Sequence, residues 1–261
     1  MSRTTLMINL SVYIITLNEE KRLAKTLKQA QKVADEIIVV DSGSTDKTLE
    51  IAKKHNAKII HNDWKSYCEQ KYFAETQCTN DYVLMLDADE VLSDKLVKEI
   101  KTLKKNPTHN AYRIKITDMF PTDTKLSRFA NTFNPVRLYN KQYVKMPKDK
   151  MNKDRVTVPA DMPVGQLQHH IYHYSIISIE DTVKKHNIHS TELQKTLEKE
   201  NRNFSILRLV TELPYQFCKY YFGKKFVFRG AYGFIMANVI AYFRFLKVAK
   251  RIETQMIRKA K

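Results

Sequence analysis

One apolar stretch near the middle of the chain constrains the fold more than any other part of the sequence. Residues Tyr82–Leu86 (YVLML) are continuously apolar, and Asp87, Asp89 and Glu90 follow them at once. A short run without polar alternation is typical of a strand buried on both faces, as in a parallel sheet covered by helices. Open α/β sheets bind ligands at the carboxyl ends of such strands. The stretch therefore predicts a central strand that delivers carboxylates into a binding crevice.

The carboxylates of Asp87 and Asp89 are predicted metal ligands. Two aspartates one residue apart can both reach one hard divalent cation, and Mg²⁺ or Mn²⁺ favours such oxygen ligands while keeping positions for substrate phosphates. The same spacing also suits a solvated turn that caps the helix expected to begin near Ser93. For an isolated Asp-x-Asp both interpretations stay open, and the context must decide.

Three further strands precede the central one and alternate with helical patterns. The strands are expected at Leu10–Thr16, Glu36–Val40 and Ala57–His61, and the helices directly after residues 17–20, from about Lys47 and from Tyr67, with Asn18 as the N-cap of the first. This alternation predicts right-handed crossovers and a mostly parallel α/β sheet flanked by helices. The strand ends at residues 16–20, 41–46 and 87–90 would then meet at one edge, where a nucleotide would lie.

The turn after the first strand excludes two common nucleotide folds. A dinucleotide-binding domain would place GxGxxG there, and a P-loop enzyme would carry GxxxxGK[ST]. The turn from Thr16 to Arg22 contains no glycine. What remains is a nucleotide held by its base and ribose at acidic strand ends, with a metal ion on its diphosphate.

Three blocks in this order resemble the sugar-nucleotide-binding blocks of family 2 glycosyltransferases with the GT-A fold. They are Ile14–Glu20 (IITLNEE), Ile38–Asp46 (IVVDSGSTD) and Leu84–Glu90 (LMLDADE). Within the family, the chain is most similar to lipopolysaccharide core glycosyltransferases. Later segments resemble further blocks of that subfamily: Val136–Tyr139, His173–Ser175 and Phe228–Phe234. The resemblance covers most of the chain, and it implies a Rossmann-like GT-A sheet without specifying a substrate.

The resemblance implies a role for each strand end. Asp41 is expected to accept a hydrogen bond from the base, and Asp87 to meet the ribose or water on the metal. Asp89 is expected to bind the Mg²⁺ or Mn²⁺ that bridges the diphosphate and acts as a Lewis acid for the departing nucleoside diphosphate. Lys71 either adds charge near the phosphates or is a surface lysine. The other residues predicted to bind the nucleotide sugar are Thr16, Asn18, Glu20, Ser42 and Gly43.

Two further residues are predicted to take part in the chemistry. His173 is expected to bind the metal or donate to the diphosphate, because it lies in a family-like block, unlike the nearby His169 and His170. An inverting transferase also needs a carboxylate that removes the acceptor's proton. Asp154 is the preferred base, although Lys153 stands where the family block usually has a histidine. A surface carboxylate paired with a lysine is the other interpretation of Asp154.

The remaining candidate bases are Asp118, Asp123, Asp149 and Asp161. The domain expected to carry all of them spans residues 1–200, with a nucleotide-sugar half at about 1–105 and an acceptor half at about 106–200. Residues 201–261 are predicted to form a separate basic, aromatic helical extension.

This extension carries thirteen Lys and Arg residues against Glu212 and Glu253. Such a charge predicts phosphate-rich partners, and basic helices with aromatic residues suit an anionic membrane surface. The apolar run Ala231–Phe243 is expected to be too short to span a membrane. Packing on the catalytic domain and contact within a homo-oligomer stay open. Nucleic acid is not an expected partner, because no known module accompanies the charge.

Together these features predict a metal-dependent, inverting glycosyltransferase that moves a sugar from a nucleoside diphosphate, UDP foremost, to a lipopolysaccharide core or other lipid-linked glycan. The residues after Met1 lack a signal-peptide pattern, so a cytoplasmic protein at the inner membrane surface is expected. Two alternatives are a transferase that modifies protein side chains and a noncatalytic protein that binds nucleotide sugars or glycolipids.

Overall fold

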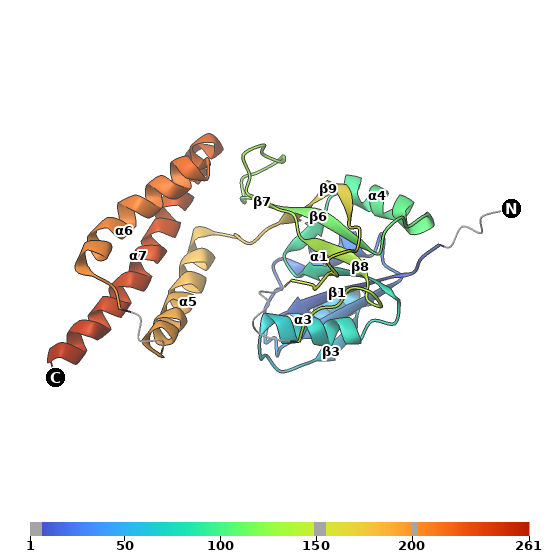
Figure 1. The fold of residues 1–261 in the computed structure, drawn as a ribbon, viewed down its shortest axis with the longest axis horizontal. Helices are drawn as coiled ribbons and strands as arrows, with labels where there is room; N and C mark the ends of the chain where they lie inside the picture. Colours follow the sequence, from blue (N-terminus) through green and yellow to red (C-terminus); the bar gives the residue numbers. More distant parts are fainter. Residues whose placement is uncertain (1–6, 149–154, 200–202, 261) are drawn as a thin grey trace. The chain divides into compact units, whose positions relative to one another are not determined.

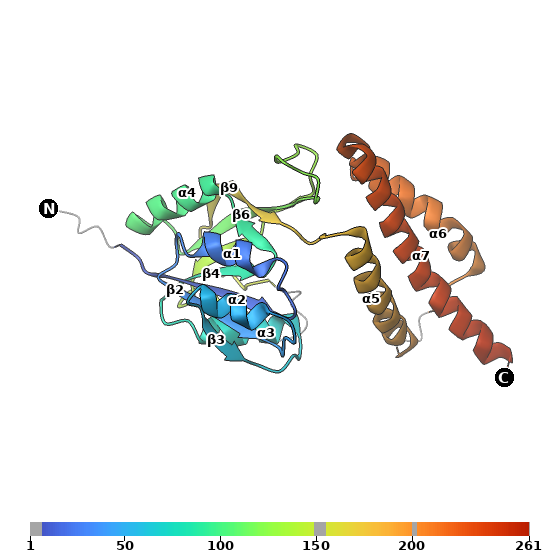
Figure 2. The ribbon, with the colours of Figure 1, turned by 180° about the vertical axis from the view of Figure 1, so that it is seen from behind.

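The computed structural model describes residues 7–148, 155–199 and 203–260. This part of the chain forms two compact units, each visible from opposite sides in Figure 1 and Figure 2. The first, here called the sheet unit, combines Met1–Asp118 with Thr132–Tyr174. The second, the helical unit, combines Met119–Asn131 with Ser175–Lys261.

The first half of the sheet unit alternates strands and helices as predicted. The elements are β1 (Leu10–Thr16), α1 (Leu23–Ala30), β2 (Glu36–Asp41), α2 (Thr48–Lys54), β3 (Lys58–His61), α3 (Tyr67–Thr76) and β4 (Tyr82–Asp87). The four strands are parallel and lie in the order β3-β2-β1-β4. The predicted parallel arrangement is therefore confirmed for this half.

Helices cover both faces of these strands, with α1 and α2 on one face and α3 on the other (Figures 1 and 2). Side chains alternate along a strand. Leu84 and Leu86 of β4 therefore enter the core beneath α1, while Val83 and Met85 enter the core beneath α3. Burial on both faces explains why the run Tyr82–Leu86 shows no polar alternation.

The second half of the sheet joins in mixed directions. Its elements are β5 (Glu90–Leu92), α4 (Asp94–Lys105), β6 (Ala111–Asp118), β7 (Thr132–Phe133), β8 (Val136–Asn140) and β9 (Gly165–His173). β8 is antiparallel to β4 and β6, β9 is parallel to β6, and β5 is antiparallel to β9. Within the described residues, the result is a nine-stranded mixed sheet in the order β3-β2-β1-β4-β8-β6-β9-β5, with β7 paired to β6.

The helical unit is built around its last helix. Its elements are α5 (Ile179–Lys199), α6 (Ile206–Cys218), a π-helical turn η1 (Lys219–Gly223), a 3₁₀ turn η2 (Phe226–Arg229) and α7 (Gly230–Ala260). Helix α7 packs against both α5 and α6. The segment Met119–Asn131 belongs to this unit, because Phe120 packs on Phe226 with ring centroids 5.3 Å apart and Asp123 pairs with Arg229.

Two features of the helical unit differ from the sequence pattern. Helix α5 packs with α7, although the sequence predicts a division near residue 200. The helical stretch Phe226–Arg258 is 33 residues long, and its most apolar 18-residue segment has a mean hydropathy of 1.4. By length and composition it could cross a membrane, and 33% of that segment is buried within the protein. The expectation that Ala231–Phe243 is too short overlooked that the same helix continues on both sides of the run.

Candidate functional site

The acidic ends of β1, β2 and β4 lie at one edge of the sheet. Strand β1 runs between the other two, and the register pairs Thr16 with Asp41 and Ile15 with Asp87. Side chains predicted from three separate blocks therefore share the edge at which open α/β sheets bind ligands. This edge is the candidate functional site.

Asp41 organises the loop that follows β2. Its buried carboxylate accepts hydrogen bonds from the backbone N–H groups of Gly43 and Ser44, each at 2.8 Å, and from the hydroxyls of Thr16 and Ser44. Gly43 has φ +98°, a left-handed value that favours glycine. The loop is thus folded back on the end of its own strand.

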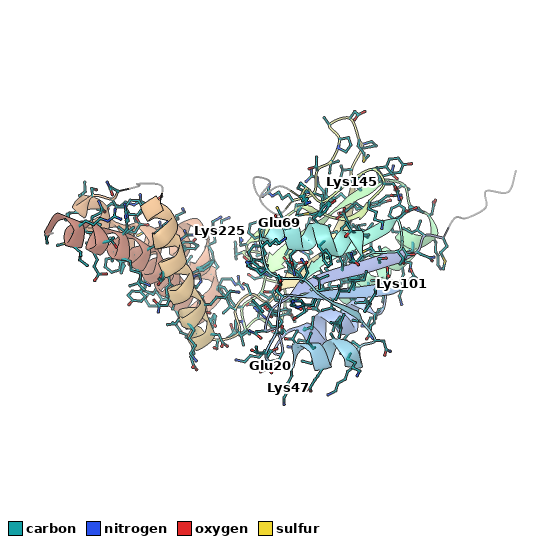
Figure 3. All side chains as sticks on the ribbon, turned by 90° about the horizontal axis from the view of Figure 1, so that it is seen from below. Glu20, Lys47, Glu69, Lys101, Lys145 and Lys225 are labelled. Atoms are coloured by element: carbon teal, nitrogen blue, oxygen red, sulfur yellow. The ribbon has the colours of Figure 1, made fainter. Side chains whose placement is uncertain are left out.

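The residues after β1 are tied to the same loop. The side-chain oxygen of Asn18 accepts a hydrogen bond from the Thr45 N–H at 2.8 Å. Glu20 lies beside Lys47 (Figure 3), whose backbone N–H donates to Glu20 Oε2 at 3.2 Å. The prediction that Asn18 caps the first helix was wrong, because Asn18 has a left-handed φ of 55° and α1 begins only at Leu23.

Helix α3 sends two buried polar side chains toward the strand ends. Gln70 donates to Ser42 Oγ at 2.8 Å. Lys71 is 1% exposed, and its ammonium lies 2.7 Å from Asp87 Oδ1. Such deep burial of a lysine is tolerated because the ion pair compensates the lost hydration. The alternative that Lys71 is a surface lysine is therefore excluded.

Asp87 and Glu90 share a second cation, Arg137 of β8. The Arg137 Nη2 lies 3.3 Å from Asp87 Oδ2 and 2.7 Å from Glu90 Oε1. Burial opposes the charge on Asp87, but Lys71 and Arg137 hold the pKa of that carboxyl well below its ordinary value. Burial raises the pKa of Glu90 to about 7, and the neighbouring Asp87 charge adds to this rise against the attraction of Arg137.

Asp89 is paired with cations from two other elements. Arg22 donates to Asp89 Oδ2 at 3.1 Å and also pairs with Glu19. On the other side, His173 Nε2 lies 3.5 Å from Asp89 Oδ1. Burial opposes ionisation of Asp89, but His173 and Arg22 lower its pKa. With its side chain 13% exposed, Asp89 does not lie in a solvated turn, and the N-cap of α4 is Ser93.

Strand pairing explains why His173 reaches this turn. In the sheet, His173 lies opposite Glu90 of β5 and beside Asp118 of β6. Asp118 Oδ1 contacts His173 Nδ1 at 2.8 Å, which leaves Nε2 directed at Asp89. Burial would lower the pKa of His173, but the hydrogen bonds to Asp118 and Asp89 raise it to about 10. The imidazolium is therefore held between two carboxylates.

The other two histidines of β9 have partners away from this turn. His169 Nδ1 lies 2.8 Å from Glu99 Oε2. His170 Nδ1 lies 2.8 Å from the hydroxyl of Thr117. These contacts join β9 to α4 and β6, so both histidines have structural partners.

The predicted catalytic base, Asp154, lies outside the described residues, as does Asp149. Of the other candidates, Asp118 holds the histidine described above, and Asp123 pairs with an arginine of the helical unit. Asp161 is exposed. Among the described candidates, Asp118 and Asp123 are thus already engaged by cations.

Arg22 and Arg137 were not predicted from the sequence to belong to the site, and Asp118 was predicted only as a candidate base. Arg137 had a signal, because it lies between Val136 and Leu138 in a predicted strand, and a buried arginine is rarely without partners. Arg22 and Asp118 had none, since Asp89 and His173, which they contact in the site, are distant from them in the sequence.

Comparison with known proteins decides the family. Residues 11–163 match the model described as Glycosyl transferase family 2. The chain belongs to glycosyltransferase family 2. An uncharacterized glycosyltransferase of Rickettsia typhi is 39% identical over 261 residues, covering 96% of this chain and 89% of the relative. Family membership makes the protein an enzyme of the transferase class.

The glycosyltransferase also resembles more distant proteins. The lipopolysaccharide core biosynthesis glycosyltransferase LpsC of Rhizobium meliloti is 26% identical over 253 residues, 92% of this chain and 91% of the relative. Among solved structures, S. aureus TarS 1–349 superposes with a TM-score of 0.48 and 18% identity over 97% of this chain and 92% of that one. The family and the helix-flanked mixed sheet identify the GT-A fold, which confirms the predicted fold class.

The donor atoms nearest to one another around Asp89 are a carboxylate oxygen and an imidazole nitrogen. Asp118 occupies Nδ1 of His173, so that Nε2 and an Asp89 oxygen face each other across 3.5 Å. A carboxylate that orients a ligating histidine is a common outer-shell arrangement, and carboxylate ligands suit Mg²⁺ or Mn²⁺. Both oxygens of Asp87 instead face protein cations. Within residues 7–148, 155–199 and 203–260, no group of three or more His, Cys, Asp or Glu side chains could hold a metal.

The glycosyltransferase should lose stability at alkaline pH through His173. The pKa of this group is raised from 6.5 to about 10 on folding, so its contribution is complete below pH 6.5 and declines as the pH rises toward 10. We expect the free energy of unfolding to fall less steeply over this range in His173→Gln than in wild type. Urea unfolding followed by the fluorescence of Trp64, the single tryptophan, reports the sheet unit.

His169→Gln on the same strand is the matched control, because it keeps the pair between His173 and Asp118. It should retain the wild-type pH dependence. Equal slopes for wild type and His173→Gln would contradict the assigned ion pair.

Proposed function

We propose that the protein transfers a sugar from a nucleoside diphosphate, UDP foremost, to a lipopolysaccharide core or another lipid-linked glycan at the inner membrane surface, with inversion. The observation that carries the proposal is the approach of His173 to Asp89 at the carboxyl ends of parallel strands. In a family 2 glycosyltransferase, this is where a donor diphosphate and its cation would lie. Donor binding is assigned to residues 1–105 and acceptor binding to residues 106–200.

The base and ribose are assigned to the loops after β1 and β2. The buried Asp41 carboxylate already accepts four hydrogen bonds. An imide N–H of uracil would take the place of one hydroxyl donor, that of Thr16 or Ser44, because the two backbone donors are fixed by the turn. Asn18 and Glu20 hold the other side of the loop through the backbone of residues 45–47. Ser42 and Gly43, which follow Asp41, are the other two residues of this loop proposed to bind the nucleotide.

Asp89 and His173 are the residues proposed to hold the divalent cation, with Asp118 orienting the imidazole. His173 would give up its Nε2 proton on binding the cation, because only the neutral imidazole is a ligand. When bound, Mg²⁺ or Mn²⁺ would neutralise charge on the departing diphosphate. Asp87 is proposed to face the ribose and not to bind the cation, because Lys71 and Arg137 already pair with its two oxygens. The same two cations keep its carboxylate ionised by lowering its pKa. Lys71 would thus act through Asp87, by fixing its charge and orientation.

Asp154 is the proposed catalytic base. In a single displacement, the acceptor oxygen forms a bond to the anomeric carbon as the carbon–oxygen bond to the diphosphate breaks. The acceptor proton passes to the Asp154 carboxylate, and the electron pair leaves with the nucleoside diphosphate. Attack from the face opposite the leaving group inverts the anomeric centre.

Two observations support a lipid-linked acceptor. The relative LpsC, 26% identical over 92% of this chain, is named for lipopolysaccharide core biosynthesis. Residues 201–261 also carry thirteen Lys and Arg residues against two Glu, a charge that suits phosphate-bearing glycolipids.

Substitution at the proposed cation site should weaken metal binding without unfolding the protein. In the presence of UDP, Asp89→Asn and His173→Gln are expected to lower the affinity for Mn²⁺ at least about tenfold. Asp118→Asn should lower it about 10- to 100-fold, as expected when an outer-shell partner of a ligand is removed. Calorimetric titration measures these affinities, and thermal shift with UDP and a panel of UDP-sugars measures donor binding.

The matched control is again His169→Gln, which should bind Mn²⁺ and UDP like the wild type, because His169 contacts Glu99 instead. Unchanged Mn²⁺ affinity in a folded Asp89→Asn protein would refute the assigned ligand. A protein that binds UDP-sugars but never transfers them to any acceptor would instead favour a noncatalytic function.

Loss of the proposed base should slow transfer and spare donor binding. We expect Asp154→Asn to lower kcat about 10²- to 10⁴-fold, the usual range for a general base. Transfer of labelled sugar to lipopolysaccharide and to polypeptides is measured in parallel, to separate the two acceptor classes. The exposed Asp161→Asn serves as control and should keep wild-type turnover. Full activity of Asp154→Asn would refute Asp154 as the base and indicate that another carboxylate removes the acceptor's proton.

A further inference from the structure

Helix α6 presents apolar side chains to solvent and polar ones to its partner helix. Leu207 is 72% exposed and Val210 69%, whereas Glu212 is 7% exposed. Ile206 is likewise exposed and Gln216 buried. In water, an amphipathic helix turns its apolar stripe toward the protein. The polarity of α6 is therefore the reverse of that expected for a helix with a solvated outer face.

Polar side chains on the buried side of α6 bind one another within the helix. Gln216 Nε2 donates to Glu212 Oε1 at 2.8 Å, and Arg208 Nε donates to Glu212 Oε2 at 3.2 Å. On α7, which packs against α6, the buried Arg251 donates to Asn203 Oδ1 at 3.0 Å. Because unsatisfied buried polar groups are costly, this mutual pairing lowers the cost of turning the polar side of α6 inward, and the apolar stripe then faces outward.

The stripe continues onto the neighbouring helix. The Phe217 ring of α6 lies 5.6 Å from that of Phe234 on α7, edge to face. Phe234 and Ile235 are themselves exposed. We call the combined surface the outer apolar face; it consists of Ile206, Leu207, Val210, Leu213, Phe234 and Ile235.

Basic residues accompany this face and indicate what covers it. Lys219, Lys224 and Lys225, the last labelled in Figure 3, are exposed in the connection between α6 and α7. Helices with a large apolar face and flanking lysines lie in the boundary between lipid headgroups and acyl chains. A second copy of the chain would bring like charges together, whereas anionic phospholipid neutralises them. The charge therefore favours a lipid surface over self-association.

We propose that the outer apolar face inserts into the headgroup boundary of a bilayer containing anionic phospholipid, with the buried polar side of α6 turned away from the lipid. The proposal deepens the proposed function, on which it rests for its purpose, because it names the surface that would keep the enzyme at a lipid-linked acceptor. Vesicle binding itself needs neither donor nor acceptor, so the two can fail independently.

Adjacent substitutions on α6 provide the test. The full-length protein is sedimented with vesicles of phosphatidylcholine, alone or mixed with phosphatidylglycerol. Val210→Glu places a carboxylate in the outer apolar face, and Thr211→Glu places one at the next exposed position, outside it. We expect binding to the anionic vesicles only, and a partition coefficient about tenfold lower for Val210→Glu than for Thr211→Glu, because only the former loses apolar contact with lipid.

Further measurements separate lipid binding from folding and from catalysis. Leu207→Glu, at an even more exposed position, should repeat the effect of Val210→Glu. All three variants should keep the wild-type circular dichroism spectrum and the wild-type thermal shift with UDP. Retained donor binding with lost vesicle binding supports the proposal, whatever the outcome of the transfer assays.

Three results would overturn the proposal. The first is equal vesicle binding by the Val210 and Thr211 variants. The second is a wild-type protein that does not bind anionic vesicles but forms a dimer in gel filtration, and a Val210→Glu variant that elutes as a monomer. That result would make the outer apolar face an interface between two copies of the chain. The third is wild-type protein that resists extraction from vesicles at alkaline pH irrespective of α6 substitutions, as expected if α7 spans the bilayer.

Discussion

The site depends on buried positive charge placed beneath a row of acidic strand ends. Lys71 of α3 and Arg137 of β8 both pair with Asp87, and Arg137 also pairs with Glu90. Breaking a buried pair by removing one partner typically costs about 3–5 kcal/mol, because the other charge is left uncompensated. These cations let the central strand end in carboxylates, at the edge proposed to bind a diphosphate and its cation.

Much of this arrangement could be predicted from local sequence, and the rest depends on long-range pairing. The apolar run Tyr82–Leu86 and the acidic residues after it predicted the buried parallel strand and its ligand edge. Lys71 could not be resolved from its neighbours alone, since helix α3 mixes polar and apolar residues on its buried side. The pairing of β9 with β5 and β6, which brings His173 between Asp89 and Asp118, joins segments that no local pattern connects.

The two units differ in which side chains they leave exposed to solvent. In the sheet unit, charged side chains are drawn inward and compensated, and this gives the strand ends their chemistry. In the helical unit, polar side chains such as Glu212 are also drawn inward, but apolar ones such as Leu207 are left facing outward. The composition of residues 201–261 predicted a helical extension. It could not predict which side of α6 faces α7, because that depends on packing against a helix later in the chain.

The central claim is that one divalent cation is held jointly by the Asp89–His173 pair and the donor diphosphate. Pulsed electron paramagnetic resonance of Mn²⁺ added to the protein with UDP tests it directly. The account predicts nitrogen coupling from an imidazole and phosphorus coupling from the diphosphate in the same complex, with the nitrogen coupling absent in His173→Gln. Bound Mn²⁺ with phosphorus coupling but no nitrogen coupling in the wild type would contradict it.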